Sequence, residues 1–161
     1  MKKCLLIVDV QKGFINKSTN HIPNLVEQLQ KDYSYVYTTR FFNKTGSFYR
    51  TLINWDRLEK NSEELELAFK PLKKTKIIDK SIYTWVDKNF LDDLKKNNIN
   101  EVHVCGIDTD ACVTKCVIDL FEQNIKPIVL AKYCASYGGV EFHECTLKIL
   151  PRLIGEKQII L

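Results

Sequence analysis

The chain has 161 residues, enough for one domain with a sizeable core, and no Pro-, Gly- or Ser-rich linker divides it. Its 24 basic and 20 acidic residues give a net charge of +4 and are scattered without interleaved aromatic residues, which argues against a nucleic-acid-binding face. No segment approaches the ~18 consecutive apolar residues of a membrane span. We therefore expect a single soluble domain, residues 1–161, with no nucleic-acid or membrane partner.

Short apolar runs alternate with segments of helical periodicity, which is typical of a parallel α/β sheet. The pattern predicts strands at residues 4–8, 35–39, 76–79, 102–105, 127–131 and 158–160, and helices at residues 23–31, 86–97, 111–123 and 140–150. The first run resembles the start of a signal peptide, but Asp9 and Gln11 interrupt it, so we expect a cytoplasmic protein. Residues 40–74 are weakly periodic and rich in aromatic side chains, and we expect them to form a lid or part of a substrate pocket, with short helices.

The segment around Cys112 carries the strongest chemical signal. An apolar run ends at Gly106, acidic residues and Thr109 follow, and a helical pattern begins. We predict that Cys112 lies in the first turn of a helix that Thr109 or Asp110 caps, where the helix terminus stabilises a thiolate and an oxyanion. The other five of the six cysteines fit buried hydrophobic positions better than a disulfide framework.

Two charged residues follow other predicted strands. Asp9 ends the first strand and Lys80 follows the third. Ligands of doubly wound sheets bind beyond the carboxyl ends of the strands, so Asp9, Lys80 and Cys112 should share one edge. In the order 3-2-1-4-5-6, the first and third strands are ~10 Å apart, and Lys80 must reach across this distance. Taken alone, an aspartate in the place of Asp9 is more often a turn or cap residue, a lysine like Lys80 a solvated side chain, and a cysteine like Cys112 an inert thiol.

The motifs around these residues resemble those of the isochorismatase-like cysteine hydrolases, the family that includes nicotinamidases and N-carbamoylsarcosine amidases. The matching segments are residues 6–14, 39–41, 80–81 and 106–113, with a further match from residue 119 to residue 136. The resemblance implies a three-layer α/β/α sandwich around a six-stranded parallel sheet of order 3-2-1-4-5-6. It also implies a homo-oligomer, because members of this family are commonly oligomeric.

The same resemblance assigns roles to site residues. It implies a catalytic triad of Asp9, Lys80 and Cys112, and an oxyanion hole made by the backbone N–H groups of Ala111 and Cys112. It further implies a cis peptide bond between Ile107 and Asp108.

The chain departs from zinc-dependent members of the family. Zinc-dependent nicotinamidases carry an Asp-x-His pair and a second histidine after the second strand, whereas residues 39–48 of this chain contain no histidine. The three histidines, His21, His103 and His143, lie elsewhere. We therefore expect no metal and no cofactor.

The thiol favours hydrolysis of a C–N bond in a small amide or carbamoyl substrate through a thioester. True isochorismatases split a vinyl ether without a thiol and have a small residue at the position of Cys112. A vinyl-ether hydrolase that uses Asp9 and Lys80 alone remains an alternative, and a non-enzymatic redox or binding protein is another.

Several residues near the triad in sequence are candidates for contact with the substrate. Phe14, Phe41, Tyr83 and Trp85 could form pocket walls or simply belong to the core. Asp108 either places a charge or an acceptor near the pocket or turns away and holds the loop. Arg40 could bind a substrate carboxylate or make a structural ion pair.

Overall fold

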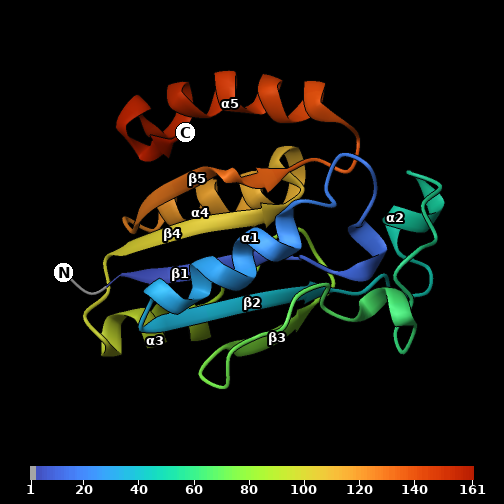
Figure 1. Ribbon diagram of the computed structural model, residues 1–161, viewed down its shortest axis with the longest axis horizontal. Coiled ribbons are helices and arrows are strands. Elements are labelled where there is room, and N and C mark those ends of the chain that lie inside the picture. Colours follow the sequence, from blue (N-terminus) through green and yellow to red (C-terminus); the bar gives the residue numbers. More distant parts are fainter. Residues whose placement is uncertain (1–2) are drawn as a thin grey trace.

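A computed structural model describes residues 3–161 as a parallel sheet with helices on both faces (Figure 1). The six strands lie in the order β3-β2-β1-β4-β5-β6, which confirms the predicted topology. Their bounds are Cys4–Val8 (β1), Tyr35–Phe41 (β2), Lys76–Lys80 (β3), Glu101–Ile107 (β4), Lys126–Ala135 (β5) and Ile159–Ile160 (β6). All neighbouring strands pair in parallel.

The helices cover the sheet in the manner of a doubly wound fold. They are α1 (Ile22–Leu29), α2 (Phe48–Thr51), α3 (Lys88–Lys96), α4 (Thr114–Glu122) and α5 (Val140–Ile154). Helix α1 crosses one face of the sheet, α3 and α4 lie on the other, and α5 packs against β5 and α4 (Figure 1). The short 3-10 turns are Lys12–Phe14, Gln30–Asp32, Glu63–Leu65 and Glu156–Gln158. None of the helices within residues 3–161 is long and apolar enough to cross a membrane.

The burial of each strand follows its place in the sheet. All residues of the central strands β1 and β4 are buried, as their continuous apolar runs predict. Strand β3 lies at the edge of the sheet, and Lys80 is its only buried residue. This edge strand therefore contributes little to the core, and its last side chain points into the protein.

The segment between β2 and β3 closes over the carboxyl ends of the strands, where α2 lies in Figure 1. It contains the short helices that its weak periodicity predicted. The Gln11 side chain fixes the segment to the sheet: its amide group donates to the carbonyl oxygens of Phe41 and Leu65 (3.0 and 3.1 Å) and accepts from the N–H of Phe41 (2.7 Å). A backbone hydrogen bond from Ala68 to Val10 adds a second attachment (2.9 Å).

Candidate active site

Asp9 lies directly after β1, with its side chain fully buried. Thr39 on the neighbouring strand β2 holds it through two hydrogen bonds. The Thr39 hydroxyl donates to Oδ1 of Asp9 (2.7 Å) and accepts from its backbone N–H (3.1 Å). The other carboxylate oxygen, Oδ2, is thereby directed away from β2. The sequence matched Thr39 to a motif but did not predict this positioning contact.

Lys80 crosses the space above β2 and reaches Asp9. Its Nζ lies 2.6 Å from Asp9 Oδ2 and donates to the carbonyl oxygens of Ile82 and Tyr83, each at 3.0 Å. The same nitrogen is 3.5 Å from the sulfur of Cys112. Burial by itself would lower the pKa of Lys80, but the charge and hydrogen bond of Asp9, together with Cys112 and Cys116, outweigh it and raise the pKa above its usual value. Lys80 is therefore a cation in this buried pair.

Cys112 is a buried residue, which changes the expected ionisation of its thiol. Burial raises the pKa of the Cys112 thiol well above its usual value; Lys80 lowers it, while Asp9 raises it further. Burial therefore opposes the standing thiolate that the sequence predicted, and the one cation that favours it, Lys80, is shared with Asp9.

The turn that carries Cys112 also differs from the prediction. Residues Thr109–Val113 form a π-helical turn, and α4 begins only at Thr114. Neither Thr109 nor Asp110 caps this turn, because Asp108 occupies the N-cap position without a side-chain cap bond. The Thr109 hydroxyl instead pairs with Nδ1 of His143 on α5 (2.8 Å). The apolar stripe in the sequence indicates which face of the helix is buried. It does not distinguish a π-helical turn from an α-helical one, because the two differ in their backbone hydrogen bonds.

The peptide bond between Ile107 and Asp108 is cis, as the resemblance implied. The N–H of Ala111, one of the two expected oxyanion donors, already donates a hydrogen bond to the carbonyl oxygen of Asp108 (3.2 Å). Ala111 and Cys112 both face the same cavity.

This site cavity has a volume of about 170 Å³ and is predominantly aromatic. The lining residues are Phe14, Phe41, Tyr49, Ile53, Trp55, Tyr83, Asp108, Ala111, Cys112 and Tyr137. Phe14, Phe41 and Tyr83 are thus where the sequence placed them. Trp85 is a correction: it is not part of this lining, because its ring packs on Phe90 of α3 and on Tyr37, with centroids 4.5 and 5.6 Å away. Tyr49 and Trp55 belong to the segment that was expected to form a lid or pocket but were not singled out in it, and Tyr137, directly after the last matching segment, was missed.

Asp108 combines the two roles that the sequence left open. Its Oδ1 accepts a hydrogen bond from the backbone N–H of Tyr137 (2.6 Å), which ties it to the loop after β5. Asp108 is also one of the residues that line the site cavity. Burial raises the pKa of Asp108 to about 7; the Tyr137 hydrogen bond opposes this change, and Asp110 and Asp9 add to it.

Arg40 makes a structural ion pair at the edge of the sheet. Its Nε and Nη2 contact the two carboxylate oxygens of Asp79 on β3 at 2.7 and 3.0 Å. It is not part of the lining of the site cavity.

The side chains present do not suit a zinc ion. Within residues 3–161, no group of three or more His, Cys, Asp or Glu side chains is arranged to hold a metal. Of the histidines, His103 pairs with Tyr33 and Glu101 and His143 with Thr109, all outside the site cavity. The loop after β2 offers Asn43, whose amide group bonds to Trp55 and Ser47.

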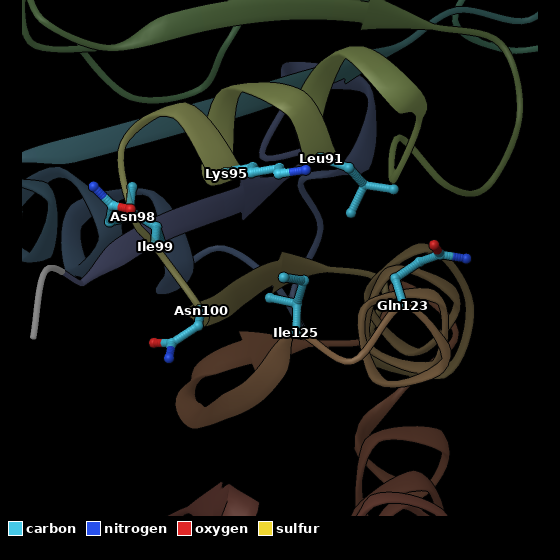
Figure 2. Close-up of a pocket in the computed structure, with 7 residues that line it drawn as sticks. All are labelled: Leu91, Lys95, Asn98, Ile99, Asn100, Gln123 and Ile125. Carbon is cyan, nitrogen blue, oxygen red and sulfur yellow. The ribbon is translucent and has the colours of Figure 1, made fainter.

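A second cavity lies at the opposite end of the sheet, near the amino ends of β4 and β5 (Figure 2). It has a volume of about 460 Å³ and is bordered by the ends of α3 and α4. Lys95 is the one charged side chain among its lining residues, which include no thiol and no carboxylate. This cavity therefore offers no nucleophile.

Comparison with protein families and with solved structures shows what the chain is similar to. The isochorismatase domain family matches residues 3–154. No curated protein matches the sequence significantly. Among solved structures, the nicotinamidase from Bacillus subtilis superposes with a TM-score of 0.84 at 20% identity, covering 100% of both chains. The N-carbamoylsarcosine amidase from Thermoplasma acidophilum superposes with a TM-score of 0.78 at 19% identity, covering 96% of this chain and 94% of that chain. A cysteine hydrolase from Pseudomonas syringae gives a TM-score of 0.80 at 21% identity, covering 98% and 87%.

Proposed function

Because the chain belongs to the isochorismatase family, we propose that it is a cysteine hydrolase that cleaves a C–N bond of a small amide or carbamoyl compound. One observation carries the proposal: Lys80 Nζ lies 2.6 Å from Asp9 and 3.5 Å from the Cys112 sulfur. A nucleophile, a base and a cation therefore meet beside a cavity of small-molecule size.

The buried pair sets the order of proton transfers. Asp9 takes the proton of the Cys112 thiol as the sulfur attacks the substrate carbonyl. The negative charge beside Lys80 therefore moves from the Asp9 carboxylate to the Cys112 sulfur, and the net charge of the site does not change. The C–S bond forms and the carbonyl becomes a tetrahedral oxyanion. The backbone N–H of Cys112, and that of Ala111 once it leaves the carbonyl oxygen of Asp108, would hold this oxyanion, at about 3 kcal/mol for each donor.

The second half of the reaction regenerates the site. Protonated Asp9 gives its proton to the leaving nitrogen as the C–N bond breaks, which leaves a thioester on Cys112. Asp9 then takes a proton from water, the hydroxide attacks the thioester, and the C–S bond breaks. The thiolate recovers the proton from Asp9, and the acid product leaves. The site needs no cofactor for these steps.

A panel of small primary amides and ureido compounds, assayed by ammonia release, tests this function. Cys112→Ala should abolish turnover, whereas Cys105→Ala should retain it, because Cys105 is an equally buried thiol on β4 outside the cavity. Acid quenching during turnover should leave the acyl group on the peptide that contains Cys112. Activity that persists in Cys112→Ala on a vinyl-ether substrate would instead favour the thiol-independent hydrolase. A protein inactive on both classes of substrate would favour a redox or binding role.

A homo-oligomer remains an expectation from the family. The exposed side chains of Phe48 and Leu52 on and beside α2 offer apolar surface for one. Sedimentation analysis would test it.

A further inference from the structure

The charges around the site cavity do not cancel. Lys80 is matched by Asp9, and Arg57 is matched by Glu64 through contacts of 2.9 and 2.6 Å. Asp108 makes no ion pair with any of residues 3–161. When Asp108 is ionised, the cavity therefore holds one carboxylate that lacks a counter-charge from the protein.

Aromatic rings line most of the cavity to which Asp108 also belongs. We call these rings the aromatic belt; its members are Phe14, Phe41, Tyr49, Trp55, Tyr83 and Tyr137. Successive rings touch one another, with centroid distances of 5.6 Å for Phe14 and Trp55, 5.9 Å for Phe41 and Trp55, 5.0 Å for Phe41 and Tyr49, and 5.1 Å for Tyr49 and Tyr83. Ring faces carry negative electrostatic potential and attract cations, most strongly where water is displaced.

The carboxyl group of Asp108 is held in place for such a contact. Its Oδ1 is fixed by the backbone N–H of Tyr137. Tyr137 is fixed in turn, because its carbonyl oxygen accepts from Asn16 (2.8 Å) and its hydroxyl accepts from Arg57 (2.6 Å). Oδ2 of Asp108 has no hydrogen-bond partner among residues 3–161 and remains available to a ligand.

We propose that this cavity selects substrates that carry a positively charged nitrogen, an ammonium group or an alkylated ring nitrogen, which the Asp108 carboxylate and the aromatic belt bind. The inference rests on the proposed function, since the carbonyl of the same molecule must reach Cys112. Asp108 and Cys112 line one cavity of about 170 Å³, so a single small molecule can contact both. The bound cation supplies the counter-charge that the protein does not.

A binding measurement tests the cation site without turnover. The chain has two tryptophans, and only Trp55 lines the cavity, so Trp85→Phe makes Trp55 fluorescence a reporter of this site. Tetramethylammonium should change that fluorescence saturably, whereas tert-butanol, a neutral molecule of similar shape, should bind at least about tenfold more weakly. Sodium chloride at equal concentration controls for ionic strength.

Asp108→Asn in the same background should weaken tetramethylammonium binding about tenfold or more. Asp110→Asn is the matched control, since it removes an exposed carboxylate two residues away and should change binding far less than Asp108→Asn does. Equal binding of the neutral molecule, or equal binding after Asp108→Asn, would overturn the inference. Circular dichroism spectra that match the parent exclude unfolding as the cause.

Kinetics separate this inference from the proposed function. If 1-methylnicotinamide is hydrolysed, its kcat/KM should exceed that of neutral nicotinamide, and Asp108→Asn should raise KM for the cation with little change in kcat. Ammonia release with no preference for cationic amides would contradict the inference and leave the proposed function intact. Saturable tetramethylammonium binding without any amidase activity would support the cation site and contradict the proposed function.

Discussion

Replacing Asp108 by Asn should stabilise the protein at high pH, at the expense of cation binding. The pKa of this carboxyl group rises from its usual 3.8 to about 7 on folding. A group whose pKa rises on folding binds its proton more tightly in the native state, so it costs stability once the pH exceeds the native pKa. The asparagine cannot ionise and keeps an oxygen to accept the N–H of Tyr137.

The size of the effect follows from that change in pKa. At about 1.4 kcal/mol per pH unit, the interval from 3.8 to about 7 corresponds to about 4 kcal/mol at pH 9. Partial solvent access to the cavity reduces this figure, so we expect Asp108→Asn to be more stable by about 2–4 kcal/mol at pH 9. The advantage should disappear progressively between pH 7 and pH 4.

Urea unfolding of Asp108→Asn and the parent protein, followed by far-UV circular dichroism from pH 4 to pH 9, measures this difference. All other titrating groups are common to both proteins, so their contributions largely cancel. Asp110→Asn removes only one of the smaller causes that raise the pKa of Asp108 and should give a much smaller pH-dependent difference over the same range. A pH-independent difference for Asp108→Asn, or a loss of stability at pH 9, would refute the reasoning that Asp108 is buried without a counter-charge.

Three further predictions concern the surroundings of the nucleophile. Thr39→Val removes a hydrogen bond to the catalytic carboxylate and should lower kcat/KM about ten- to hundredfold in the ammonia assay. Gly106→Ala would place a Cβ 2.1 Å from a backbone oxygen and should lower Tm by about 10 °C or more, whereas Gly46→Ala, which meets open space, should cost about 1 kcal/mol. Iodoacetamide at pH 7 should modify exposed Cys145 before buried Cys112, as peptide mapping can show.

Each of these three has a clear contrary outcome. Unchanged kcat/KM in Thr39→Val would mean that the hydroxyl does not position the base. Equal Tm values for the two glycine variants would remove the steric argument at Gly106. Fastest alkylation at Cys112 would mean that the thiolate is already formed before substrate binds.

The sequence by itself determined the order of elements and the edge at which the chemistry lies. Continuous apolar runs predict the buried strands β1 and β4, because a parallel strand covered on both faces must be apolar on both. The carboxyl ends of parallel strands lie at one edge of the sheet. The positions of Asp9, Lys80 and Cys112 at or just after predicted strands were therefore enough to predict that the three side chains lie close together. These are local patterns, and local patterns can be read along a chain.

Only the tertiary structure decided the ionisation of the site and the shape of its cavity. Burial raises the pKa of Cys112 while Lys80, from a separate strand, lowers it, and no spacing in the sequence expresses this balance. Trp55 and Tyr137 line the cavity while Trp85 does not, since loop packing, and not closeness in sequence, directs these rings. Electrostatics and packing depend on distances in space, and those distances are fixed only when the segments assemble.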